Sequence, residues 1–399
     1  MPKRMGNLWG ILISDENLEE AIDEVNRTHH WRTHHRPNAT TAWVEETKSE
    51  RIKELRQILI DGFVPKTPHV TERWDASAQK WRTVSEPAQW PDQYVHHALI
   101  QILQPVMMRG MDKWCCGSIR DRGPHQAQAA IESWMRDDKK GTKYEFSGDI
   151  YHFYDSLKPE VVIARMRQLI KDWRVLDLIE RIISKGVLIG AYTSQWFANT
   201  VLQPLDMLIR QSGLCAHYTR YMDNLTVFGS NKRKLKKLRI LVEKWLNNHQ
   251  LQLKSDWQIF PVAKREPHQP LPPPRRGVTR QKGRMPDAVG YRYGRGYTLP
   301  RKHNLLRIKR ALARYRKRKR QGKKIFAGAA SSLISRLGQL KHCNNHNLYW
   351  MLFQGQRIMR DLKRIVRENH RKEELTWSMY LERRAKSKSL KPKAMPIPT

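Results

Sequence analysis

Apolar residues recur every three or four positions along several stretches of the chain, which is the spacing of an amphipathic helix. The first stripe runs from Asp15, a residue that can cap a helix, to about Arg27 and consists of Leu18, Ala21, Ile22 and Val25. The same spacing predicts further helices over residues 48–61, 94–108, 159–169, 194–211, 232–247, 304–321 and 346–370.

Short apolar or β-branched runs bounded by turn residues predict strands. Val70–Trp74 and Lys80–Val84 predict a hairpin, as do the runs Cys215–Arg220 and Leu225–Phe228 on either side of Asp223. Single strands are expected over Lys143–Ile150, Leu251–Phe260 and Ala288–Arg292. A strand, two helices, a hairpin, a helix and a strand in this order predict an α+β fold with Asp149 and Asp223 on neighbouring strands.

The chain is strongly basic. Its 399 residues include 75 Lys and Arg against 38 Asp and Glu, a formal net charge of +37. Such an excess repels itself, so a polyanion such as nucleic acid is the expected partner, and binding should weaken with salt. A membrane surface is the rival polyanion, but no apolar run is long enough to span a bilayer and the basic helices lack an apolar face for insertion.

Cysteine usage and the start of the chain indicate a cytoplasmic protein. The four cysteines are Cys115, Cys116, Cys215 and Cys343, and none forms a Cys-x-x-Cys pair. This is poor material for a disulfide framework or a zinc site and fits a reducing compartment. No long apolar segment follows Met1, so no signal peptide is expected.

Three motifs occur in a fixed order. They are Phe146-Ser147-Gly148-Asp149-Ile150-Tyr151-His152-Phe153-Tyr154, the segment Gly186–Gln195, and Tyr221-Met222-Asp223-Asn224. A lone Tyr-x-Asp triplet is frequent by chance, but the order and spacing of all three resemble a reverse transcriptase of the bacterial group that includes retrons, group II introns and diversity-generating retroelements. The resemblance runs from about residue 10 to 370 and implies a right-hand polymerase with fingers, a palm built on an antiparallel sheet, and a helical thumb.

The resemblance also implies domain boundaries. Residues 1–142 would form the fingers with N-terminal helices, and 143–295 the palm, with a Pro-rich insertion at about 264–286. Residues 296–372 would form a basic helical thumb, and 373–399 a basic flexible tail. The insertion reads most simply as an exposed loop, with a docking peptide for a partner as the alternative.

Phosphoryl transfer builds negative charge on the entering and leaving oxygens, which two Mg2+ ions roughly 3.5–4 Å apart stabilise. Because Mg2+ prefers oxygen ligands, we predict Asp149 and Asp223 as the catalytic, metal-binding carboxylates, with the backbone carbonyl of Ile150 assisting. Mn2+ is the alternative ion. Alone, Asp149 would be an ordinary acid at a strand end, and the ordered motifs favour the metal role.

One position departs from the family. The hairpin tip usually carries two Asp, and here the second is Asn224, which we keep in the catalytic set. Asparagine retains an acceptor oxygen but removes a charge, which should weaken metal affinity. An RNA-binding descendant that lacks catalysis therefore stays open as an alternative.

The resemblance implies several nucleotide-binding residues. Arg82 would grip the triphosphate of the incoming nucleotide, and Arg120 and Arg122 belong to the next finger motif, although Ile119 stands where the family has arginine. Tyr154, five residues after Asp149, would block a ribose 2′-hydroxyl and favour deoxynucleotides. Lys254 would neutralise or protonate pyrophosphate, or face a phosphate.

The segment around Ile189 narrows the resemblance. Most relatives have Gln-Gly and Ser-Pro where this chain has Ile189-Gly190 and Ser194-Gln195. These versions resemble diversity-generating retroelement enzymes. Replacing Gln by Ile removes a hydrogen-bonding group beside the nucleotide, so lower copying fidelity is implied.

The predicted helix 304–321 carries an apolar stripe and an opposite basic face. Although charge runs are usually solvated, this one continues an amphipathic helix, so we predict that it tracks nucleic acid. The predicted contacts are Arg307, Arg310, Arg314, Lys317 and Arg318.

The sequence thus predicts an RNA-directed DNA polymerase that makes cDNA from a cognate structured RNA, for mutagenic retrohoming. Its expected partners are the RNA template, the DNA product or RNA–DNA hybrid and deoxynucleotides, with an accessory protein or a second copy as alternatives. An antiviral-defence enzyme with a dedicated non-coding RNA is the other reading of the same scaffold. An intron maturase is disfavoured because no His/Asn endonuclease motif is present. The expected location is a bacterial cytoplasm, with the gene bacterial or phage-encoded.

Overall fold

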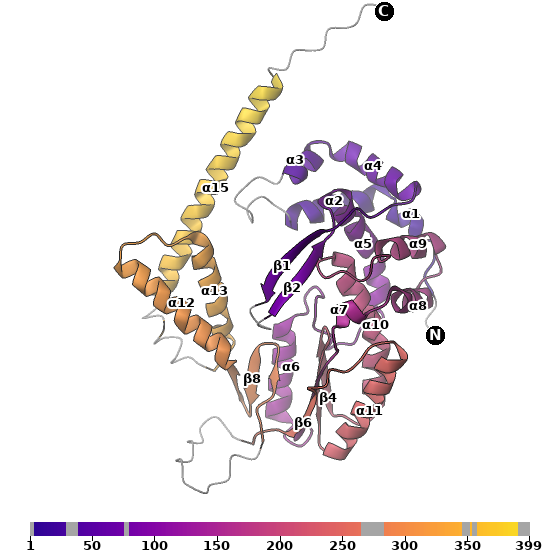
Figure 1. The fold of residues 1–399 in the computed structure, drawn as a ribbon, viewed down its shortest axis with the longest axis vertical. Helices are drawn as coiled ribbons and strands as arrows, with labels where there is room; N and C mark the ends of the chain where they lie inside the picture. Colours follow the sequence, from indigo (N-terminus) through magenta and orange to yellow (C-terminus); the bar gives the residue numbers. More distant parts are fainter. Residues whose placement is uncertain are drawn as a thin grey trace, which may run out of the picture. The chain divides into compact units, whose positions relative to one another are not determined.

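The computed structural model describes residues 4–28, 39–75, 80–264, 283–344, 352 and 357–389. The chain divides into two compact units, one formed by Met1–Val25 and Thr47–Arg301 and the other by Asn26–Glu46 and Lys302–Thr399. The described residues form helices and antiparallel sheets (Figure 1), which confirms the predicted α+β class.

A four-stranded antiparallel sheet in the order β4-β5-β3-β6 forms the centre of the first unit. The register pairs Asn224 with both Asp149 and Tyr221, so β3, β4 and β5 reach one end of the sheet together. The strands are β3 (Tyr144–Asp149), β4 (His217–Tyr221), β5 (Asn224–Gly229) and β6 (Gln258–Pro261).

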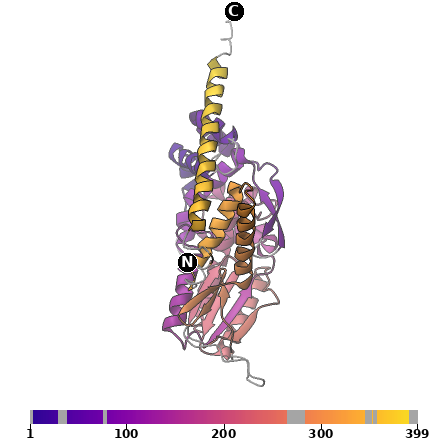
Figure 2. The same cartoon turned by 90° about the vertical axis from the view of Figure 1, so that its left-hand side faces the viewer.

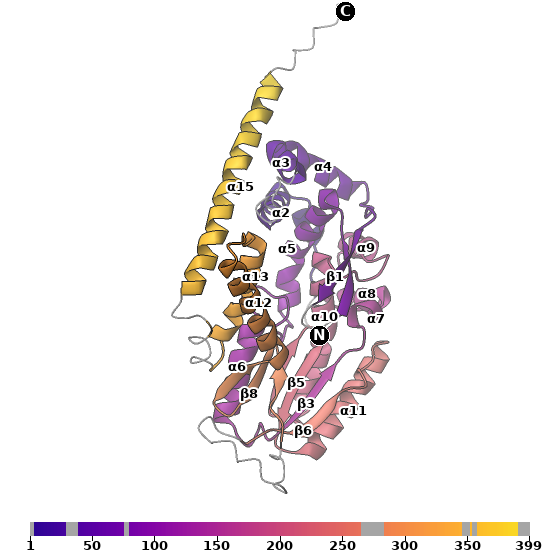
Figure 3. The ribbon, with the colours of Figure 1, turned by 60° about the vertical axis from the view of Figure 1, so that its left-hand side comes forward.

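Different helices cover the two faces of this sheet. The helices α10 (Tyr192–Gln211) and α11 (Lys232–Asn248) lie on one face, where Tyr218 donates a hydrogen bond to Asp206 of α10. The helix α6 (Pro124–Asp137) lies on the other, where Trp134 contacts the rings of His217 and Phe228. Figure 3 shows α6 and α11 on opposite sides of the strands. Since side chains alternate along a strand, Asp149 shares the α6 side with Phe228.

The rest of the first unit packs around α5, whose side chains are largely buried because the stretch is apolar on nearly every side. All four residues of the predicted stripe in α2 are fully buried, which confirms that helix. The remaining elements are α1 (Leu8–Leu12), α2 (Asp15–Thr28), α4 (Lys48–Ile60), β1 (His69–Asp75), β2 (Lys80–Glu86), a π-helical turn (Gln89–Gln93), α5 (Tyr94–Met108), α7 (Phe153–Ser156), α8 (Pro159–Leu169) and α9 (Trp173–Ile182).

Two strand predictions were wrong. The expected strand Leu251–Phe260 is regular only as β6, because the chain makes a turn from Ser255 before pairing with β3. The expected strand Ala288–Arg292 is a hairpin whose turn holds Val289 and Gly290 at φ 45° and 93°. It belongs to a small sheet of β7 (Asp287–Ala288), β8 (Tyr291–Gly294) and β9 (Tyr297–Pro300).

The second unit is helical and contains α3 (Ala39–Glu46), α12 (Lys302–Arg320), α13 (Ala327–Lys341) and α15 (Arg357–Ser389). Its core joins Ile308 and Leu312 of α12 to Leu333 and Leu337 of α13 and Leu362 of α15. The sequence analysis missed α13, whose leucine spacing is partly hidden by Ala, Gly and Ser.

The prediction that the last helix ends near residue 370 was also wrong. Figure 2 shows α15 as one continuous helix, and it runs to Ser389 through the first part of the segment expected to be a flexible tail. Lysine and arginine are good helix formers, so the basic composition does not end the helix. The rest of that tail, 390–399, lies outside the described residues, as do 346–351 and 353–356 of the predicted helix.

Most of the predicted Pro-rich insertion, residues 265–282, also lies outside the described residues. The chain on its two sides is joined, since the amide of Ala263 donates to the carbonyl of Arg284 at 3.0 Å. In the part of the chain that the structure describes, no helix is long and apolar enough to cross a membrane.

Glu145 in β3 is fully buried, and neither of its carboxylate oxygens has a hydrogen-bond partner among the described residues. Burial raises the pKa of this carboxyl to about 8, from an ordinary value of 4.5. The folded state therefore holds the proton more tightly than the unfolded state, so the contribution of Glu145 to stability is fully present below about pH 4.5 and is lost as the pH rises through about 8.

We expect Glu145→Gln, which imitates the protonated acid, to raise the thermal midpoint at pH 8, by an amount equivalent to about 3 kcal/mol, and to change little near pH 5. Thermal unfolding of both proteins across this pH range measures the effect. Glu45→Gln, a change at an exposed acid of α3, is the control and should leave the pH dependence unaltered. A variant of Glu145 that is destabilised at pH 8 would contradict the assignment.

Candidate active site

The structure brings Asp149 and Asp223 together at the end of the central sheet. Asp149 ends β3, and Asp223 lies in the two-residue turn between β4 and β5, whose other residue, Met222, has a left-handed φ of 55°. The amide of Ile150 donates to the carbonyl of Asp223 at 3.2 Å, which ties the two segments. Burial, followed by the charge and the hydrogen bond of the adjacent Asp223 carboxyl, raises the pKa of Asp149 to about 7.

This pair suits a hard divalent cation. Asp149 Oδ1 is buried and has no hydrogen-bond partner among the described residues, so it is an acceptor left without a donor. No group of three or more His, Cys, Asp or Glu side chains able to hold an ion occurs in the described ranges. An ion at the pair would therefore complete its shell with backbone carbonyls such as that of Ile150, water or phosphate oxygens, as Mg2+ usually does.

Two of the predicted nucleotide-binding residues, Lys254 and Tyr154, lie near the pair of carboxylates. Lys254 donates its backbone N–H to the carbonyl of Asp149 at 2.8 Å and its Nζ to Asp256 at 2.6 Å. The hydrogen bond with Asp256 raises the pKa of Lys254, and the charges of Asp149 and Asp223 add to the rise. Tyr154 in α7 lies within range of the charge on Asp223, which, after burial, is the next cause of its raised pKa. Lys254 therefore offers a cation beside the carboxylates, and Tyr154 a largely buried ring.

The hairpin β1–β2 carries Arg82, whose Nε donates to Asp75 at 2.7 Å. Arg82 is also close enough to Tyr154 to lower the pKa of that phenol. The loop with Ile189 and Gly190 is attached to the same hairpin, because the amide of Ser85 donates to the carbonyl of Ile189 at 2.7 Å. The structure thus gathers Arg82, Tyr154 and this loop on the approach to the carboxylates.

Gly190 is required by this attachment. Its φ is 114°, which side-chain-bearing residues rarely adopt, and a Cβ there would lie 2.8 Å from Cγ1 of Val84. Gln195 is exposed in the first turn of α10, and Asn224 is exposed beside the pair. Neither side chain is held by a hydrogen bond that the structure records, so both are accessible to a ligand.

Arg120 and Arg122 differ in their surroundings. Arg122 donates Nη1 to the carbonyl of Asp112 at 2.8 Å, so it stabilises its own loop. Arg120 is exposed, and its charge lowers the pKa of Tyr192 in α10, a minor effect beside burial. The structure therefore leaves Arg120 free of the loop contact that engages Arg122.

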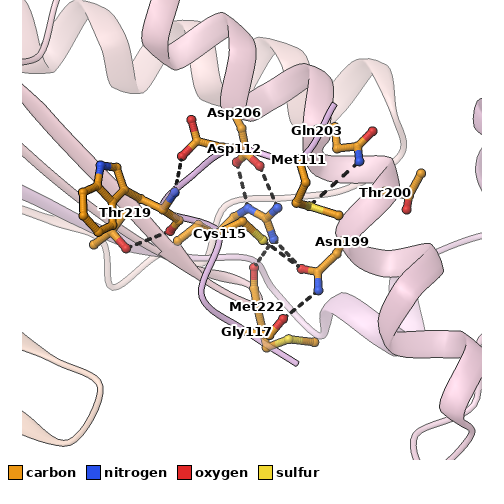
Figure 4. A network of polar contacts seen from close by, with 12 residues as sticks. Met111, Asp112, Cys115, Gly117, Asn199, Thr200, Gln203, Asp206, Thr219 and Met222 are labelled. Carbon is orange, nitrogen blue, oxygen red and sulfur yellow. Dashed lines mark hydrogen bonds and ion pairs between the residues drawn. The ribbon is translucent and has the colours of Figure 1, made fainter. Parts of the chain in front are cut away.

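A buried arginine that the sequence analysis overlooked lies beneath the carboxylates. Arg220, next to the turn in β4, is 0% exposed and forms two hydrogen bonds with Asp206 of α10, at 2.8 and 2.7 Å. Its Nη1 donates to the carbonyl of Met222 at 2.8 Å and to Oδ1 of Asn199 at 2.9 Å. Figure 4 shows the three residues that accept these hydrogen bonds, Asp206, Asn199 and Met222. Arg220 therefore holds the carbonyl that precedes Asp223.

The same network reaches the loop that carries Arg122. Asn199 donates Nδ2 to the carbonyl of Gly117 at 2.8 Å. A Cβ on Gly117 would lie 2.6 Å from the backbone nitrogen of Met222, so only glycine allows this loop to approach the turn so closely. The position of Arg220 immediately before the Tyr221 motif was the only signal in the sequence.

In the second unit, four of the five predicted nucleic-acid contacts are exposed on α12: Arg310, Arg314, Lys317 and Arg318. Arg318 donates to the carbonyl of Lys324, so it also stabilises the end of α12. Arg336 of α13, which the sequence analysis did not select, has its pKa lowered by burial and then by the charges of Arg307 and Arg314. These three arginines form one positive cluster.

Breaking the Arg220–Asp206 pair should destabilise the first unit strongly, because it leaves an unpaired charge in the interior. We expect Asp206→Asn to cost about 3 kcal/mol or more and Arg220→Lys somewhat less. Urea unfolding measures both. The exposed pair Arg167–Glu180, at 2.8 Å, provides the control, and Arg167→Met should cost under about 1 kcal/mol. Similar losses at the two pairs would contradict the role given to burial.

The family model described as reverse transcriptase (RNA-dependent DNA polymerase) matches residues 64–257. No curated protein matches the chain. Among solved structures, apo telomerase from Candida tropicalis is similar at 11% identity and a TM-score of 0.41, over 62% of this chain and 53% of that chain.

Two further structures are similar to the same extent. A Candida tropicalis telomerase truncated from its C-terminal domain matches at 12% identity and a TM-score of 0.40, over 62% of this chain and 59% of that chain. A Candida albicans telomerase in complex with a fragment of telomeric RNA matches at 11% identity and a TM-score of 0.41, over 85% of this chain and 60% of that chain. The chain thus spans just over half the length of these telomerases.

The family match includes both carboxylates, Arg82, Tyr154, the loop with Gly190, and Lys254. Residues 64–257 are therefore a reverse transcriptase domain, the domain of RNA-directed DNA polymerases, which are nucleotidyltransferases.

Proposed function

We propose that this protein copies a structured RNA into cDNA from deoxynucleotides. The observation that carries the proposal is the meeting of Asp149 and Asp223, with an unsatisfied buried oxygen, inside the reverse transcriptase domain. This arrangement fits a centre where a 3′-hydroxyl attacks the α-phosphate of a nucleotide and pyrophosphate departs.

The residues around the pair have separate tasks in this proposal. Bound divalent cations, Mg2+ or Mn2+, would neutralise charge on the entering and leaving oxygens. Asp149 and Asp223 position that charge, with the carbonyl of Ile150 in reach. Lys254 places an ammonium beside the carboxylates, where it can face the departing pyrophosphate, and Arg82 can exchange Asp75 for the triphosphate.

Selection of the nucleotide would rest on Tyr154 and the loop at Ile189. The largely buried ring of Tyr154 lies near Asp223, where a ribose would sit, so it can exclude a 2′-hydroxyl. Ile189 and Gly190 meet β2 near Arg82, and an aliphatic side chain offers no hydrogen bond to the nucleotide. This chemistry supports low fidelity and hence mutagenic retrohoming of a diversity-generating retroelement.

The same scaffold has two alternative roles. An antiviral-defence enzyme with a dedicated non-coding RNA would use the same two carboxylates, and a stand-alone gene cassette would favour it over retrohoming. Asn224 removes a carboxylate next to the pair, which supports a weakened enzyme that acts as an RNA-binding scaffold. RNA, the RNA–DNA hybrid and an accessory protein or second copy are the proposed partners; the exposed cations of α12 suit the first two.

Extension of a DNA primer on an RNA template tests the proposal. We expect Asp149→Asn and Asp223→Asn each to slow incorporation by about a hundredfold or more, because several kcal/mol of charge stabilisation are lost. Asp155→Asn is the matched control, since this exposed acid of α7 has His152, at 3.3 Å, as its ion-pair partner among the described residues. Equal incorporation by all three variants would refute the site. No incorporation by the wild type, with a large gain from Asn224→Asp, would favour the scaffold.

Divalent metal binding without nucleic acid should depend on pH. The pKa of Asp149 is raised to about 7, so below that pH a proton competes with the metal, and above it the carboxylate is free. We expect affinity for Mn2+ to fall as the pH drops from about 8 to 6, with a proton released on binding near pH 7. Calorimetry in two buffers counts the protons, and affinity that does not change over this range would contradict the coupling.

A further inference from the structure

A strongly basic surface lies on α11, a helix to which the polymerase site assigns no role. Arg239 is paired with Glu243, whereas the other basic residues are exposed and have no carboxylate partner within the described part of the chain. We call this surface the α11 basic face, and its residues are Lys232, Arg233, Lys234, Lys236, Lys237 and Lys244.

The α11 basic face points away from the carboxylates. The helix buries Leu235, Leu238 and Val242 against the central sheet, and Leu235 lies beside Gly229 of β5. The register puts Asp149 on the opposite side of that sheet, the side of α6. Figure 3 shows α6 and α11 on opposite sides of the strands. A template–primer duplex seated on Asp149 would therefore have the sheet between itself and α11.

The positive charges of the α11 basic face destabilise the helix that carries them. The first turn of a helix favours acids, as in α2 with Asp15 and Glu16, but α11 has no acid there. Lys232 and Lys236 are four residues apart, as are Arg233 and Lys237, so like charges face one another. The arrangement disfavours the isolated protein, and a bound polyanion would reverse the effect.

The side chains, and not the helix terminus, would be the contacts. Asn231 already accepts hydrogen bonds from the amides of Arg233 and Lys234, at 2.8 and 3.3 Å. Six flexible cations without a fixed acceptor suit phosphate groups along a strand, which they would contact without reading sequence. A lipid surface is less suited, because the apolar stripe of α11 is buried against the sheet and only Ile240 and Leu241 remain exposed for insertion.

We propose that the α11 basic face binds the phosphate backbone of a folded RNA at a place separate from the template–primer site. The identity of the polyanion as RNA rests on the proposed function, whereas the binding surface does not. Such a contact would hold a structured RNA on the enzyme while another part of that RNA is copied at Asp149. The chain would then recognise its template by shape and charge on two sides of the same sheet.

The test compares two triple variants of the full chain. One is Lys232→Gln, Lys236→Gln and Lys237→Gln on α11. The matched control is Lys53→Gln, Lys158→Gln and Lys185→Gln, which removes three exposed lysines elsewhere in the first unit. The probe is a labelled RNA hairpin with a stem of about 16 base pairs, titrated at several salt concentrations.

We expect the α11 variant to bind the hairpin about tenfold more weakly near 0.1 M salt, with a salt slope lower by two to three, roughly one per lost phosphate contact. The control should stay within about twofold of the wild type. Removing the repulsion should raise the thermal midpoint of the α11 variant by about 1–3 °C, so weaker binding cannot be ascribed to misfolding. Extension of oligo(dT) on poly(rA) should remain within about twofold for both variants, because the catalytic side of the sheet is unchanged.

Each contrary result has a definite meaning. Equal weakening in the control would show unspecific attraction and overturn the proposal, and so would extension that falls together with hairpin binding. Loss of binding to phosphatidylserine vesicles, with hairpin binding retained, would replace RNA by a membrane. If the wild type extends no primer but the two variants still differ in hairpin binding, the proposed function fails and the surface stands.

Discussion

The buried contact between Arg220 and Asp206 is the constraint on which the catalytic end of the sheet depends. A guanidinium with 0% exposure is stable only when its donors are satisfied, and here they join α10, the carbonyl of Met222 and, through Asn199, the loop at Gly117. The turn that presents Asp223 is thereby fixed from below. Above it, Asp223 faces Asp149, a carboxyl whose pKa is raised by burial and by the charge of Asp223, and whose Oδ1 has no hydrogen-bond partner among the described residues. The turn is thus held by hydrogen bonds on the side of Arg220. On the side of Asp149 it faces a carboxylate oxygen without a donor, which suits a cation.

Motif order and apolar spacing predicted the central sheet and its pair of acids. Asp149 and Asp223 stand far apart in the chain, yet each follows a run that reads as a strand, so their meeting could be inferred before any coordinates. The helix α13 was not predicted because its apolar stripe is interrupted by small residues. The end of α15 was not predicted because a lysine-rich composition resembles a disordered tail. The role of Arg220 was not predicted for a different reason. Its burial depends on hydrogen bonds with Asp206 and Asn199, which lie 14 and 21 residues away in the sequence.

Part of the positive charge of the chain is concentrated on two helices. The formal net charge of +37 is carried partly by α12 and partly by the α11 basic face, and these belong to different units of the fold. Acids, by contrast, have defined places in the catalytic region: Asp206 neutralises Arg220, and Asp149 and Asp223 form the pair at the end of the sheet.

The joined ends around residues 265–282 have a practical consequence. Because the amides and carbonyls of Ala263, Arg284 and Pro261 hold the chain together at that point, the strands on both sides keep their register whatever lies between them. Lengthening a chain segment whose two ends are held together costs only the slowly growing entropy of closing it. A fluorescent protein or an affinity tag could therefore be spliced in at this position, leaving both termini unaltered.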